Sequence, residues 1–176
     1  MHLFFWFITI VAIYFVLVFV GLRLVVPFFD FKPLTVPQDL PGEISAAIAE
    51  LENKSKDQKS YLQSVYDFVL DKTLYQWKHT RFKAGVRLDR LFVKDILEIW
   101  QTKDFVYCQG INYIAFVLLS KSKFFKPEDV RTRHVFVNFV IHQYLRVKVA
   151  DVWIDFDPAG TGIRGKFLGT HLVFFG

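Results

Sequence analysis

Residues 142–157 read HQYLRVKVADVWIDFD, and this stretch decides the fold of the 176-residue chain. Polar and apolar side chains alternate on both sides of Ala150-Asp151, which predicts two antiparallel strands joined by a two-residue turn. The face that should pack on the core carries Leu145, Val147, Val149, Val152, Ile154 and Phe156. The other face carries His142, Tyr144, Arg146, Lys148, Trp153, Asp155 and Asp157. The predicted hairpin therefore has one apolar and one polar face.

The position of the turn sets which residues are neighbours on the polar face. With the turn at Ala150-Asp151, Arg146 lies opposite Asp155, and we expect these two to pair. His142 becomes a diagonal neighbour of Asp157, about 7 Å away between Cα atoms and closer between side chains. An imidazole and a carboxylate can form a hydrogen bond across that gap.

Upstream of the hairpin, apolar residues recur with helical spacing, which favours an α+β fold of helices packed on an antiparallel sheet. The predicted helices begin near Ile44, cover about 57–71 and 88–100, and run from Cys108 to about Ser120. The last of these is apolar on nearly every side, as a central helix would be. Residues 135–141 predict a further strand before His142.

Cys108 is the only cysteine of the chain and stands where a loop meets the N-terminus of the apolar helix. Free amide N–H groups and the helix dipole stabilise a thiolate at such a position. His142 could accept the thiol proton, and Asp157 could orient the imidazole and stabilise its charged form. Cys108, His142 and Asp157 are therefore the candidate catalytic residues. Gln101 could add a side-chain donor for an oxyanion.

These residues resemble the motifs of the transglutaminase-like superfamily. The family has a cysteine at the start of a central helix, then a strand that begins His-x-aromatic-apolar, as in His142–Val147 here. The next strand ends Trp-apolar-x-apolar-Asp-Pro, as in Trp153–Pro158. Ser60–Tyr75 also resembles the helix upstream of the cysteine, so that the resemblance covers roughly 57–160. The family often has Gly-x-Cys, whereas this chain has Val106-Tyr107-Cys108.

The resemblance implies a papain-like core and a thiol enzyme that cleaves or transfers acyl groups at amide or peptide bonds. A catalytically inactive domain of the same fold, which acts as a membrane-tethered protein-binding module, is the alternative. A third possibility is an unrelated anchored structural protein whose cysteine is buried and inert.

The N-terminus predicts a membrane anchor, because Leu3 to Leu22 is a run of 20 residues without a charge. As a helix the run would be about 30 Å long, the thickness of the hydrocarbon core of a bilayer. It is too long for the apolar region of a signal peptide, and neither a preceding Lys or Arg nor a small-x-small cleavage site accompanies it. We expect an anchor over 1–29, a Pro-rich tether over 30–43 and a transglutaminase-like domain over 44–176.

The anchor would hold the chain as a single-pass membrane protein whose substrate is a protein or peptide near the lipid bilayer. Arg23 and Lys32, which follow the apolar run, are too few to decide which side of the membrane the domain faces.

The composition excludes several classes of protein. With 53% hydrophobic and 18% aromatic residues, the chain is too apolar to be disordered. One cysteine excludes an internal disulfide and any site that needs several thiolates. The net charge of +5 is scattered along the chain, so we expect no nucleic-acid binding. The histidines lack ligand spacing, and the C-terminal glycines form no nucleotide loop, so we predict no metal and no cofactor.

Overall fold

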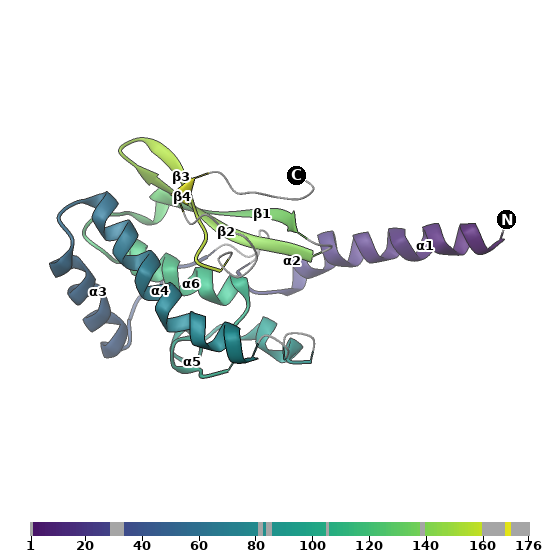
Figure 1. Ribbon diagram of the computed structural model, residues 1–176, viewed down its shortest axis with the longest axis horizontal. Coiled ribbons are helices and arrows are strands. Elements are labelled where there is room, and N and C mark those ends of the chain that lie inside the picture. The colour runs from purple at the N-terminus through teal and green to yellow at the C-terminus, as the bar shows by residue number, and fades with distance from the viewer. Residues whose placement is uncertain are drawn as a thin grey trace.

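The computed structural model describes residues 2–28, 34–80, 83, 86–104, 106–137, 140–159 and 168–169. Within these residues the protein has an α+β fold, in which helices pack on a small antiparallel sheet (Figure 1). The predicted fold class is confirmed at this level.

The sheet has its strands in chain order, each antiparallel to the next: β1 (Val130–Val137), β2 (Val140–Val149), β3 (Val152–Phe156) and β4 (Leu168–Gly169). Arg146 pairs with Asp155 across β2 and β3, which confirms the predicted register. The turn residues Ala150 and Asp151 have φ angles of 46° and 69°, the left-handed values that a two-residue hairpin turn needs.

One strand boundary was predicted wrongly. The stretch 135–141, predicted as a single strand, spans the end of β1 and the start of β2, and Val137 pairs with Val140. Asn138 and Phe139 stand between those two valines, and without a glycine or proline the turn signal there was weak.

The helices of the domain are α3 (Gly42–Lys54), α4 (Gln58–Thr80), α5 (Ile96–Gln101) and α6 (Cys108–Ser120). Short 3₁₀ turns form η3 (Leu88–Phe92) and η4 (Pro127–Asp129). The predicted start and end of α6 are confirmed, and α6 packs against both α4 and β2 (Figure 1). Every residue of α6 after Cys108 is buried, as expected for a central helix.

The helix predicted over 88–100 is instead divided into η3 and α5. Asp95 caps the N-terminus of α5, because its carboxylate accepts a hydrogen bond from the backbone N–H of Glu98 at 2.8 Å. A side chain that caps the first turn in this way starts a new helix. The apolar periodicity continued across both pieces and concealed the break.

The core combines residues from α3, α4, α6 and the sheet; its fully enclosed side chains include Ile44, Leu62, Ile111, Leu118, Leu145 and Phe156. The predicted apolar face of the hairpin is buried near its base, where Leu145 and Val147 are 0% exposed. Val152 adjoins the turn and is 63% exposed, so the core face does not extend to the hairpin tip as predicted.

The N-terminus is helical in three consecutive pieces: α1 (His2–Val16), a π-helical turn η1 (Leu17–Gly21) and α2 (Leu22–Val25). α1 extends away from the rest of the described structure (Figure 1). None of the helices in the described part of the chain is at once long enough and apolar enough to span a membrane. The transmembrane anchor predicted over 1–29 is thus not supported by these helices.

The chain after α2 packs on the domain. Val26 is 1% exposed and Phe28 is 8% exposed, and Phe28 belongs to the hydrophobic core. In the described part of the predicted tether, Leu34, Val36 and Leu40 pack against the same core. These residues therefore contribute to the folded domain rather than to a free spacer.

Candidate active site

Cys108 is the first residue of α6, and Tyr107 before it is in the extended conformation, with φ −74° and ψ 166°. The side chain of Tyr107 does not form a capping hydrogen bond to the helix. The amide N–H groups of the first helical turn have no partner within the helix. Cys108 is a free cysteine and is half-buried. The sulfur therefore lies at the positive end of a helix dipole.

His142 and Asp157 are bonded across the hairpin. His142 Nε2 lies 2.9 Å from Asp157 Oδ2, and the two residues are only 3% and 1% exposed. The sequence-based expectation that these two side chains meet agrees with this geometry. Asp155, which shares the polar face of the hairpin with Asp157, pairs with Arg146 as expected, and Arg146 Nε lies 2.9 Å from Asp155 Oδ1.

The electrostatics of His142 link it to Cys108. Burial by itself would lower the pKa of His142, but hydrogen bonds to Asp157 and to Cys108, together with their charges, outweigh it and raise that pKa to about 10. Since Asp157 is bonded to Nε2, Nδ1 is the ring nitrogen left for the thiol. His142 is therefore bonded to a carboxylate, and Cys108 contributes to the environment that raises its pKa.

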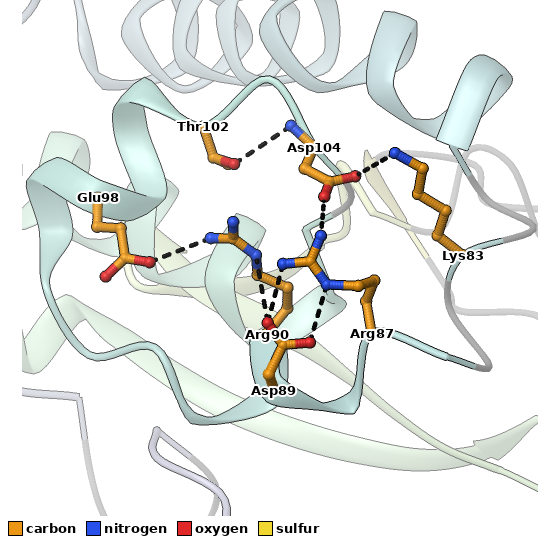
Figure 2. A network of polar contacts seen from close by, with 7 residues as sticks. All are labelled: Lys83, Arg87, Asp89, Arg90, Glu98, Thr102 and Asp104. Carbon is orange, nitrogen blue, oxygen red and sulfur yellow. Dashed lines mark hydrogen bonds and ion pairs between the residues drawn. The ribbon is translucent and has the colours of Figure 1, made fainter.

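A network of ion pairs holds the loop that leads into α6 (Figure 2). Asp104 accepts hydrogen bonds from Lys83 Nζ at 3.1 Å and from Arg87 Nη1. Arg87 also binds both carboxylate oxygens of Asp89, each at 2.9 Å. The backbone N–H of Asp104 donates to Thr102 Oγ1 at 3.2 Å. Lys83 and Arg87, which precede η3, thus hold the loop that leads into Cys108.

The same loop packs closely on the first turn of α6. A Cβ atom on Gly110 would lie 2.7 Å from Val106 Cγ1 and 3.5 Å from Ile99 Cγ2. Val106 is 8% exposed and stands two residues before Cys108. Glycine at position 110 therefore lets the loop approach the helix closely.

Asn112 joins the helix of Cys108 to the strand of His142. Its Nδ2 donates to the backbone carbonyl of Gln143 at 2.6 Å, and both residues are 0% exposed. Asn112 lies one helical turn after Cys108, and Gln143 directly follows His142. The bond therefore fixes the spacing of the two elements that bring thiol and imidazole together.

Gln101 does not have the predicted role of an oxyanion donor. It is exposed at the end of α5, and its Nε2 donates to Glu43 Oε1 on α3 at 2.5 Å. The residues that sequence reasoning missed are Asn112, Gln143 and Asp104. Only Asn112 had a local signal, as a polar residue in the middle of an otherwise apolar helix.

Within the described residues, no group of three or more His, Cys, Asp or Glu side chains is placed to hold a metal ion. Comparison of the chain with protein-family models, with curated proteins and with solved structures gives no match. The resemblance to transglutaminase-like domains therefore rests on the sequence motifs alone.

Proposed function

We propose that the protein is a transglutaminase-like thiol enzyme that cleaves or transfers acyl groups at amide or peptide bonds. Cys108 would be the nucleophile, His142 the acid and base, and Asp157 the residue that orients the imidazole. The observation that carries the proposal is the position of His142, which is buried and bonded to Asp157 at 2.9 Å, and whose pKa is raised by Asp157 and then by Cys108. A buried imidazole with this pair of partners suits nucleophilic catalysis by a thiol.

The reaction follows from these groups. The Cys108 thiolate bonds to the carbonyl carbon of an amide, and the carbonyl electrons move to the oxygen. Amide N–H groups at the start of α6 stabilise this oxyanion. The C–N bond then breaks as His142 gives its proton to the leaving nitrogen, which departs as an amine and leaves a thioester on Cys108. Water or a second amine attacks the thioester, His142 accepts its proton, and the sulfur leaves as thiolate.

The pH dependence of alkylation tests the proposal. The full chain in detergent micelles would be treated with iodoacetamide between pH 5 and pH 9, and because Cys108 is the only cysteine, each adduct reports on this site. An ordinary thiol, with a pKa of about 8.5, is less than about 1% ionised at pH 6. We expect wild-type protein to react at pH 6 at least about tenfold faster than His142→Ala, because the imidazolium stabilises the thiolate.

Asp157→Asn should slow the reaction in the same direction, whereas Asp155→Asn is the matched control, as its carboxylate pairs with Arg146 on the same hairpin. If wild type and His142→Ala react alike at every pH while both are folded, the enzyme proposal fails. The same fold would then act as a protein-binding module. With a reactive thiol, ammonia release from a glutamine peptide, measured with and without a primary amine, separates hydrolysis from acyl transfer.

We further propose that the helical run His2–Val25 associates with a lipid bilayer. Phe4, Phe5, Trp6 and Phe7 are each between 61% and 70% exposed, and Ile10 is 63% exposed. Contiguous exposed apolar surface of this kind is typical of membrane or protein contacts. The site would then act on proteins or peptides near the bilayer.

Vesicle flotation tests the membrane proposal. Full-length protein should float with phosphatidylcholine vesicles, and Phe7→Asp with Ile10→Asp should abolish flotation, because each charge opposes insertion by about 3 kcal/mol. Val86→Asp with Phe92→Asp is the control, since these residues are 75% and 47% exposed but lie outside α1. Equal flotation of both double variants would contradict the proposal.

A further inference from the structure

The segment that follows the N-terminal helices is built into the candidate active site. Phe28 stacks on Tyr113 of α6, with ring centroids 4.0 Å apart and planes inclined by 19°. The backbone carbonyl of Phe28 accepts a hydrogen bond from Gln143 Nε2 at 2.6 Å. α6 begins with Cys108, and Gln143 directly follows His142. One buried residue beside the N-terminal helices thus contacts both elements of the Cys–His pair.

The backbone of Phe28 shows that this position is held by its surroundings. Its φ angle is 65°, in the left-handed region that a bulky residue rarely adopts. Such a conformation persists only where neighbouring contacts impose it. The stacking on Tyr113 and the bond from Gln143 are the contacts that impose it here.

A second contact brings the same region to the sheet. His134 on β1 pairs with Gln143 on β2, and His134 Nε2 lies 3.3 Å from Gln143 Nε2. The pKa of His134 is lowered to about 4, first by burial and then by the positive charges of Arg23 and His142. Arg23 belongs to α2, and the adjoining turn η1 contacts β2, so the end of the N-terminal helices lies close to the strand of His142.

We propose that Gln143 is a positioning residue that ties Val26–Phe28 to the strand of His142, so that Cys108 reacts fully only while this segment is docked. The inference rests on the proposed function, because it concerns the reactivity of the same Cys–His pair. Gln143 is 0% exposed and directly follows His142 on β2, so it acts on the site through His142. The state of the N-terminal helices, free or inserted in a bilayer, would then regulate the site.

Two variants of the full chain in detergent micelles test this inference. Gln143→Met keeps the length of the side chain and removes its amide, and Phe28→Ala removes the ring that stacks on Tyr113. We expect each to slow iodoacetamide alkylation at pH 6 by about tenfold and to shift the pH profile of alkylation toward that of His142→Ala. Two independent contacts on the same segment keep the test valid if one variant fails to fold.

Tyr61→Phe is the matched control for a buried hydrogen bond on α6. The Tyr61 hydroxyl donates to the Leu118 carbonyl at 2.8 Å, on the half of α6 away from Cys108. This variant loses one buried bond, as Gln143→Met does, and its pH profile should match wild type. If Gln143→Met keeps the wild-type profile, or if Tyr61→Phe shifts it as much, the positioning role is refuted while the proposed function stands. An inert wild-type thiol would refute both.

Discussion

The close approach of Val106 to Gly110 gives the most quantitative prediction. In Gly110→Ala the new Cβ would lie 2.7 Å from Val106 Cγ1. Non-bonded carbon atoms are comfortable at about 3.5–4.0 Å, so the loop must move outward by about 1 Å. Such overpacking costs about 1–3 kcal/mol, against a gain in helix propensity of at most about 1 kcal/mol for alanine over glycine. We expect Gly110→Ala to lower the free energy of unfolding by about 1 kcal/mol.

A double-mutant cycle isolates the contact itself. Val106→Ala removes the methyl group that the new Cβ meets, and by itself it should destabilise the protein, because Val106 is 8% exposed. In the double variant the clash is gone, so its loss should be smaller than the sum of the single losses by about 1–3 kcal/mol. Urea unfolding of the full chain in detergent, followed by far-UV circular dichroism, measures all four free energies.

The alkylation rate of Cys108 provides a second readout from the same four proteins. The displaced loop leads directly into the cysteine, so Gly110→Ala should change the rate, and Val106→Ala in that background should restore it. Two results would refute the reasoning: a Gly110→Ala protein more stable than wild type, or single effects that add within about 0.5 kcal/mol.

Two further predictions concern charge. The imidazole of His142, followed by NMR, should titrate near its raised pKa of about 10 rather than the usual 6.5. The contribution of charged His142 to the free energy of unfolding is therefore complete below about pH 6.5 and is lost as the pH rises toward 10. Asp157→Asn should lower the midpoint, and a wild-type midpoint at or below 6.5 would contradict the bonded arrangement. Asp104→Asn should lower the Tm, by more at low than at high salt, because Lys83 and Arg87 lose their shared carboxylate. Glu50→Gln is the control, since its pair with Lys54 is exposed, and an equal salt effect in both variants would contradict a special role for the network.

The parts of the fold that could be predicted are those with a local cause. The β2–β3 register follows from the alternation of side chains about Ala150-Asp151, and the start of α6 follows from the change to apolar residues at Cys108. Where the local pattern continued through a boundary, prediction failed. The valines that end β1 and begin β2 concealed the boundary between these strands, and apolar spacing concealed the cap at Asp95.

The candidate site divides in the same way. His142 and Asp157 lie 15 residues apart on one hairpin, so their meeting could be worked out from the strand register. Gln143 meets Phe28 at a separation of 115 residues and Asn112 at a separation of 31. Asn112 has a local signal as a polar residue in a largely apolar helix, but the sequence does not indicate the partner in either contact, because long-range packing alone brings these residues together. Gln101 shows the converse error, since a residue close to the cysteine in sequence points to Glu43 on another helix.

The order of the strands has a consequence for how the protein folds. Strands that are adjacent in the sheet are also consecutive in the chain. The sheet can therefore form through short loop closures, which are fast. The bond from Gln143 to Phe28 instead closes a loop of 115 residues, and such contacts form late. We therefore expect the hairpin with His142 and Asp157 to assemble first and the thiol to gain its reactivity last, as pulsed alkylation during refolding would record. A partly folded chain would thus be protected from premature chemistry at its own cysteine.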